Sequence, residues 1–190
     1  RMTQAILPLR GKILNVASAS AEKLRGNQEL TDLVQALGCG TGDRYNDDAL
    51  RYEKVIIMTD ADVDGAHIAS LLMTFFDKET PQLVEQGHLY LAMPPLFRIT
   101  QGGKTLYAKD ESHKAELIKT EFTGKAKIEI SRFKGLGEMP AAQLKETTMH
   151  PENRNLLKIT VPETMDSGNL KSRQSLEETE HLESTVETLM

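Results

Sequence analysis

The sequence has one cysteine, no tryptophan and no apolar run long enough to cross a bilayer. A single thiol, Cys39, can form neither an internal disulfide nor a paired-cysteine zinc site, so we expect a cytoplasmic protein in a reducing compartment. Because neither a secretory signal pattern nor an apolar stretch of about 20 residues is present, we expect no membrane partner and no secretion. The length of 190 residues suits one domain better than two.

The net charge of -5 is unevenly distributed along the chain. Residues 163–190 hold seven acidic and two basic side chains, and removing these from the totals of 28 and 23 leaves 21 of each sign in residues 1–162. The body is therefore neutral and can still carry a local basic surface that binds phosphates. Residues 163–190 predict an acidic, partly flexible C-terminal segment.

An acidic segment follows the clearest strand pattern. Residues 55–58 are a short apolar run, typical of a strand buried on both faces of a parallel sheet. Apolar residues then recur at helical spacing from Ala66 to about Val84, so strand, loop and helix predict one βα unit. The loop holds Asp60, Asp62 and Asp64, and we expect it at the carboxyl edge of a sheet, where α/β folds bind ligands.

Other segments predict a mixture of helices and strands. A helix is expected over residues 21–37 and another from a cap at Asp110 to residue 119, with a third beginning near Pro140. Strands are expected at residues 88–93, 127–133 and 156–161, and residues 96–101 and 104–108 predict a β-hairpin across Gly102-Gly103.

Three aspartates at alternate positions repel one another unless a cation offsets their charge, so the pattern favours a divalent metal over a solvated polar loop. The spacing matches the start of an EF-hand calcium loop, but position 12, where a glutamate is required, is Leu71. A haloacid-dehalogenase-like phosphatase is an alternative, because there a strand ends in two such aspartates, here Asp60 and Asp62, and the first attacks phosphorus. Asp64 argues against it, since that position is usually apolar in such enzymes.

Three blocks that occur in the same order resemble one known family. They are Pro8-Leu9-Arg10-Gly11-Lys12-Ile13-Leu14-Asn15-Val16, Met58-Thr59-Asp60-Ala61-Asp62-Val63-Asp64-Gly65-Ala66-His67-Ile68 and Arg132-Phe133-Lys134-Gly135-Leu136-Gly137-Glu138-Met139. Together they resemble the B subunit of bacterial type IIA DNA topoisomerases over about residues 2–162, and the topoisomerase IV protein more closely than the gyrase protein. The resemblance implies an α/β fold. Residues 1–162 would be a partial Toprim domain, a Rossmann-like and mostly parallel sheet flanked by helices, with a β-hairpin added and its first strand missing.

The resemblance also implies a function. In this family a tyrosine of the partner A subunit attacks double-stranded DNA, and the Toprim domain supplies Mg2+ at the cleaved phosphate. The implied function is part of the cleavage-religation core of an ATP-dependent, strand-passing A2B2 enzyme associated with the nucleoid. None of the tyrosines here lies in a matching motif, so no catalytic residue is assigned to this chain.

Site residues carry over position by position. Asp60 and Asp62 match metal ligands of the family, and Asp64 matches an acidic position of the same motif. Arg10 and Lys12 match family positions close to the bound DNA, with ordinary surface as the alternative. His67, directly after the aspartate motif, is interpreted as either a phosphate contact or a polar residue of the first helical turn, and Lys134 as a residue that faces DNA or braces the site, or as part of the loop structure alone.

The chain departs from the family in one motif. Nothing here matches the upstream Glu-Gly-Asp-Ser-Ala segment, whose glutamate is a further metal ligand, and the ATP-binding region is not represented. We therefore expect a sequence truncated at both ends, which binds no ATP and is inactive alone. A non-catalytic module that binds DNA or another protein chain is the third functional hypothesis.

Overall fold

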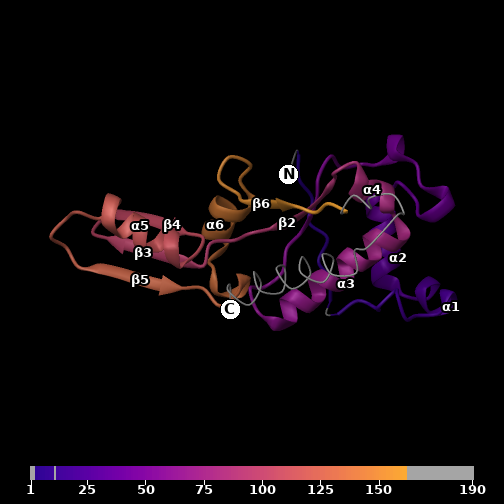
Figure 1. Ribbon diagram of the computed structural model, residues 1–190, viewed down its shortest axis with the longest axis horizontal. Coiled ribbons are helices and arrows are strands. Elements are labelled where there is room, and N and C mark those ends of the chain that lie inside the picture. Colours follow the sequence, from indigo (N-terminus) through magenta and orange to yellow (C-terminus); the bar gives the residue numbers. More distant parts are fainter. Residues whose placement is uncertain (1–2, 11, 162–190) are drawn as a thin grey trace, which may run out of the picture. The chain divides into compact units, whose positions relative to one another are not determined.

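The computed structural model describes residues 3–10 and 12–161, so the predicted acidic segment 163–190 lies outside the described residues. The chain divides into two compact units, each described separately (Figure 1). The first contains the described residues up to Met58, with His67–Leu91 and Leu156–Val161. The second contains Thr59–Ala66 and Ala92–Asn155.

The helices are α1 (Ala21–Arg25), α2 (Gln28–Leu37), α3 (Val63–Glu79), α4 (Pro81–Glu85), α5 (Glu111–Glu121) and α6 (Ala141–Leu144). Short helical turns are η1 (Gly42–Arg44), η2 (Asp47–Ala49), η3 (Leu136–Glu138) and the π-helical η4 (Lys145–Met149). The strands are β1 (Val55–Ile57), β2 (Leu89–Ala92), β3 (Phe97–Gln101), β4 (Lys104–Ala108), β5 (Ile128–Arg132) and β6 (Leu156–Lys158).

The first unit is built around a three-stranded sheet of order β1-β2-β6. β1 and β2 are parallel, with Val55 opposite Leu89 and Ile57 opposite Leu91. Two backbone hydrogen bonds, from Ile159 N to Leu89 O and from Met93 N to Asn155 O, show that residue numbers rise along β2 as they fall along its partner β6. β6 is therefore antiparallel to β2. Apolar side chains from α2, α3 and α4 pack with this sheet into one core, in which Phe76, Leu83 and Leu89 are almost fully buried.

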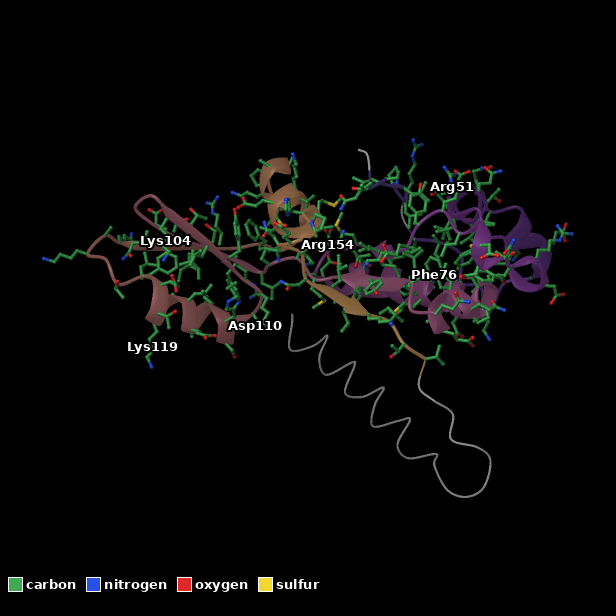
Figure 2. The ribbon with its side chains drawn as sticks, turned by 90° about the horizontal axis from the view of Figure 1, so that it is seen from above. Arg51, Phe76, Lys104, Asp110, Lys119 and Arg154 are labelled. Carbon is green, nitrogen blue, oxygen red and sulfur yellow. The ribbon has the colours of Figure 1, made fainter. Side chains whose placement is uncertain are left out.

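The second unit contains an antiparallel sheet of order β4-β3-β5. Gly102 has a φ of +61° at the first position of the β3–β4 turn, the conformation that a type II′ hairpin turn requires there. Asp110 caps α5 by accepting a 2.7 Å hydrogen bond from His113 N. Figure 2 shows Asp110 and Lys119 along α5, and Lys104 on the adjacent β4.

Most predicted elements are present, but two helical predictions were wrong in detail. The helix expected over residues 21–37 is interrupted, because α1 ends at Arg25, before Gly26, and Asn27 caps a new helix by accepting a bond from Leu30 N. The helix expected from Ala66 to about Val84 begins earlier, at Val63, and ends at Glu79, since Pro81 starts the separate helix α4.

Mixed α/β structure is confirmed. β1 and β2 are the parallel pair, whereas β3, β4 and β5 pair antiparallel, and the Rossmann-like arrangement stays a prediction. Within the described part of the chain, no helix is both long and apolar enough to cross a membrane.

Candidate metal site

Asp62 fixes the start of helix α3. Its carboxylate Oδ1 accepts a 2.7 Å hydrogen bond from Gly65 N, and its backbone carbonyl accepts the first helical bond from Ala66 N at 2.9 Å. This is the geometry of an N-cap, in which an aspartate satisfies an N–H group that has no partner within the helix. The helix therefore begins at Val63, and Asp64 lies in its first turn, where negative charge is favourable.

Asp60 is joined to a distant loop of the same unit. Its Oδ1 accepts a 2.8 Å hydrogen bond from the backbone N–H of Leu136, which is 76 residues away in sequence. Leu136 is the first residue of η3 in the Lys134–Glu138 loop, so its N–H has no helical partner and is available to the carboxylate. The contact brings the second and third sequence blocks together.

Two glycines allow this close approach. A Cβ at Gly135 would lie 2.9 Å from Asp60 Cγ and within 3.2 Å of both its carboxylate oxygens. A Cβ at Gly65 would collide with the backbone carbonyl oxygen of Asp60. Gly65 and Gly135 therefore form a cradle around Asp60 that any larger residue would fill.

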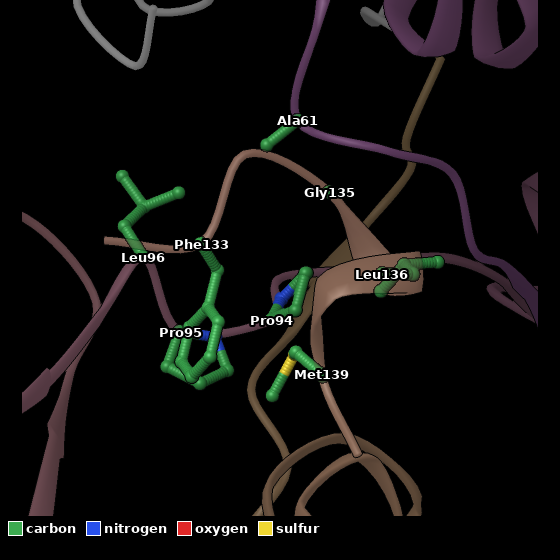
Figure 3. Close-up of a pocket in the computed structure, with 8 residues that line it drawn as sticks. All are labelled: Ala61, Pro94, Pro95, Leu96, Phe133, Gly135, Leu136 and Met139. Carbon is green, nitrogen blue, oxygen red and sulfur yellow. The ribbon is translucent and has the colours of Figure 1, made fainter. Parts of the chain in front are cut away.

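The loop that carries Leu136 is held at both ends. Glu138 Oε2 accepts a 2.7 Å bond from Lys134 N, which closes the loop, and Phe133 N donates to Leu96 O at 2.8 Å. Phe133 and Met139 are buried and line, with Pro94, Pro95 and Leu96, an apolar pocket of about 10 Å³ (Figure 3). A space of that size holds at most about one water molecule. The loop thus rests on packed apolar side chains.

The predicted DNA-binding residues fall in both units. Lys134 is exposed and shares a unit with the three aspartates. Arg10, Lys12 and His67 are also exposed, but they belong to the first unit.

The donor set suits magnesium, although it is incomplete. Within residues 3–10 and 12–161, no three His, Cys, Asp or Glu side chains lie close enough to hold one metal ion. Asp60 and Asp62 each use Oδ1 for a backbone N–H, which orients the carboxylate and leaves Oδ2 for a hard cation such as Mg2+. Each of the two carboxylates therefore has the chemistry of a Mg2+ ligand, and a cation bound there would take its further ligands from water or DNA.

Two of the four tyrosines, Tyr45 and Tyr107, are in surroundings that disfavour the phenolate. Burial, with a 2.8 Å hydrogen bond to Asp47, raises the pKa of Tyr45, and burial followed by the charge of Glu146 raises that of Tyr107. A raised pKa makes the phenolate harder to form, which is the opposite of what a nucleophilic attack needs.

Gly65, Gly135, Leu136 and Glu138 were not predicted as site residues. Leu136 acts through its backbone N–H, which leaves no signal in residue type. The two glycines had a visible signal, because Gly135 precedes Leu136 and Gly65 follows the last aspartate, but sequence alone did not show that both approach Asp60.

Comparison with known proteins covers almost the whole chain. The Toprim domain family matches residues 1–94, and the family described as DNA gyrase B subunit, carboxyl terminus, matches residues 125–190. The B subunit of DNA topoisomerase 4 from Bartonella bacilliformis is 68% identical over 161 residues, which are 85% of this chain and 23% of that protein. The protein of the same name from Caulobacter vibrioides is 58% identical over 190 residues, all of this chain and 25% of that protein. The B subunit of DNA gyrase from Thermotoga maritima is 46% identical over 170 residues, 90% of this chain and 26% of that protein. The chain thus spans about a quarter of the length of these relatives.

Proposed function

Because the chain belongs to the B-subunit family of type II DNA topoisomerases, with its Toprim and gyrase B carboxyl-terminal regions, we propose that it forms the magnesium-binding part of a DNA cleavage-religation core. The observation that carries this proposal is the carboxylate of Asp60, cradled by Gly65 and Gly135 and oriented by the Leu136 N–H. The identities, higher for topoisomerase 4 than for gyrase, favour a topoisomerase IV enzyme.

The proposed ligands are Asp60 and Asp62, with Asp64 in a supporting role at the helix start. When bound there, Mg2+ would stabilise negative charge on the cleaved phosphate and on the departing oxygen. Asp60 and Asp62 hold their carboxylates in fixed orientations, because each already accepts a backbone N–H. A side chain that is already oriented loses little conformational freedom when it binds a metal ion, so less of the binding free energy is spent on ordering it.

Four side chains are proposed to bind the DNA backbone: Arg10, Lys12, His67 and Lys134. All four are exposed, as phosphate contacts require. Their role would be to hold the duplex in register while the carboxylates act at the reacting phosphate.

The remaining chemistry is proposed to come from the assembled enzyme. The attacking tyrosine would belong to an A subunit in an A2B2 assembly, and ATP would be used elsewhere in the full-length B protein. We infer a cytoplasmic, nucleoid-associated enzyme of ATP-driven strand passage, and we expect residues 1–190 alone to leave supercoiled DNA unchanged. Residues 1–162 are the proposed Toprim part.

The experiment combines the full-length B protein, its partner A subunit and supercoiled DNA with Mg2+, and measures how much A subunit is covalently attached to DNA. We expect attachment with the wild type and loss of at least about 100-fold with the Asp60→Ala, Asp62→Ala double variant, as when a principal charge-stabilising group is removed. Equal attachment with both proteins would reject the proposed metal role. Phosphatase turnover that depends on Asp60 would revive the haloacid-dehalogenase alternative. DNA binding indifferent to both Mg2+ and the aspartates would favour a non-catalytic module.

A further inference from the structure

We propose that the Lys134–Glu138 loop is the positioning element of Asp60, with the Leu136 N–H as the orienting group and Glu138 as the brace that shapes the loop. This inference rests on the proposed function, in which Asp60 is a magnesium ligand. It adds Leu136 and Glu138, which are assigned no contact with the metal or with DNA and act only through Asp60.

The first step is the direct contact. Leu136 N lies 2.8 Å from Asp60 Oδ1, within the range of a charge-assisted hydrogen bond. A carboxylate has about four lone-pair positions, so this bond fixes the plane of the group and leaves Oδ2 free of that contact. Asp60 is exposed, and an exposed carboxylate without such a bond would rotate between several orientations.

The second step is the brace. Glu138 Oε2 accepts from Lys134 N at 2.7 Å, while Glu138 N donates to Gly135 O at 3.2 Å and Met139 N to Leu136 O at 3.1 Å. These bonds close the loop on itself and leave the Leu136 N–H pointing at Asp60. Without the Glu138 carboxylate, the Lys134 N–H loses this acceptor, and the loop loses the bond that spans it.

The third step is the support beneath the loop. Phe133 and Met139 are 8% and 6% exposed, so both ends of the loop are anchored in packed apolar surroundings. Gly135 lies against the Asp60 carboxylate, since a Cβ there would be 2.9 Å from Cγ. The contact with Asp60 is therefore built into the packing of the loop.

The hydrogen bond from the Leu136 N–H to Asp60 can be removed by one substitution. Leu136 is the first residue of η3, and the preceding Gly135 is extended with φ -167° and ψ 174°. Position 136 therefore suits proline, which is common at the first helical position and favours an extended residue before it. Leu136→Pro deletes the N–H and puts the ring Cδ in its place, so the Asp60 carboxylate must turn away from the loop. Leu136→Ala is the matched control that keeps the N–H and loses the side chain.

Glu138 offers a second, independent pair of variants. Glu138→Gln keeps a side-chain oxygen that can accept from Lys134 N, whereas Glu138→Ala does not. A bracing role predicts that Glu138→Gln behaves as wild type. A role as metal ligand or proton carrier would require the carboxylate, and Glu138→Gln would then fail as Glu138→Ala does.

The test uses calorimetry to measure the Mg2+ affinity of the full-length B protein without nucleotide, with hydrogen exchange of residues 60–66 as the check on folding. We expect Leu136→Pro and Glu138→Ala to weaken Mg2+ binding by about 10-fold or more, the usual effect of losing a group that orients a metal ligand. Leu136→Ala and Glu138→Gln should stay within about twofold of wild type, since both keep the positioning bonds.

An Asp60→Ala variant separates the two proposals. If Asp60→Ala abolishes Mg2+ binding while Leu136→Pro equals Leu136→Ala and Glu138→Ala equals wild type, the positioning role is overturned and the metal role stands. If Asp60→Ala leaves Mg2+ binding unchanged, the metal role itself is overturned, and the positioning role with it. If Leu136→Pro fails to fold, the comparison of Glu138→Ala with Glu138→Gln decides alone.

Discussion

Gly65 lies so close to the backbone carbonyl oxygen of Asp60 that no side chain fits between them. The contact forms because α3 begins at Val63, which turns the chain sharply after Asp60 and brings the third helical residue back over it. Glycine at position 65 is thus needed for space near a backbone atom, which cannot move aside as the end of a long side chain can.

We expect Gly65→Ala to disturb the acidic segment. The added Cβ forces the Asp60 carbonyl away, which should destabilise this region by about 1–3 kcal/mol, as for other overpacked sites. Hydrogen exchange of residues 60–66 should accelerate, and Mg2+ affinity should fall with it.

Gly137→Ala is the matched control for that variant. A Cβ at Gly137 meets no atom within 4 Å, so we expect exchange of residues 60–66 and Mg2+ affinity close to wild type. Equal effects of the two substitutions would show that the contact between Gly65 and Asp60 is unimportant.

Asp62 has two separable roles, one structural and one proposed. Asparagine caps helices about as well as aspartate, so Asp62→Asn should keep the stability of α3 while removing the charge that would bind Mg2+. Asp62→Ala should lose both, with a cost of about 1 kcal/mol for the missing cap. Thermal unfolding and Mg2+ calorimetry on both variants give the comparison. Normal Mg2+ affinity in Asp62→Asn would remove Asp62 from the ligand set.

Local structure was largely predictable from the sequence, whereas the long-range contact at the site was not. The strand at residues 55–57, the hairpin across Gly102-Gly103 and the Asp110 cap follow from short-range patterns of apolar residues, glycines and capping side chains. The start of α3 was misplaced because Asp62 was interpreted as a metal ligand and not also as an N-cap.

The contact between Asp60 and Leu136 depends on how two loops are brought together by packing. Its donor is a backbone N–H, and a backbone group carries no residue-type signal. The apolar residues that anchor the loop, Phe133 and Met139, look like ordinary core residues in the sequence. Only the folded arrangement identifies them as support for Asp60.

The proposed DNA contacts predict a specific salt dependence. A lysine or arginine bound to a phosphate releases about one counterion, so Arg10→Ala and Lys134→Ala should each reduce the slope of log affinity against log salt by about 1. The measurement is DNA binding by the full-length B protein with its A subunit across a range of salt concentrations. Lys119→Ala, on exposed helix α5, is the control and should leave the slope unchanged. Slopes that do not distinguish the three variants would reject Arg10 and Lys134 as phosphate contacts.

The hydrogen bond between Tyr45 and Asp47 predicts a loss of stability in alkaline solution. Tyr45 donates its hydroxyl proton to Asp47 Oδ1 over 2.8 Å, and burial together with this bond raises the tyrosine pKa above its ordinary value of 10. His88 Nε2 also lies 3.8 Å from Asp47, so the carboxylate faces both side chains. In the unfolded chain Tyr45 ionises near pH 10, whereas in the folded protein it keeps its proton to higher pH.

The stability contributed by Tyr45 is therefore fully present below about pH 10 and lost as the pH rises further. Phenylalanine cannot ionise, so the midpoint of thermal unfolding of Tyr45→Phe should fall less steeply than that of the wild type between pH 9 and about 11. At neutral pH the variant should be less stable than the wild type by about 0.5–1.5 kcal/mol, because it lacks the hydrogen bond. Burial also raises the pKa of Tyr107, which is the same in wild type and variant and cancels in the difference between the two curves. Cys39, whose pKa burial raises too, interacts with Tyr45 by charge, so the difference reports Tyr45 together with its effect on Cys39. Parallel curves for wild type and Tyr45→Phe would mean that Tyr45 titrates alike in the folded and unfolded states.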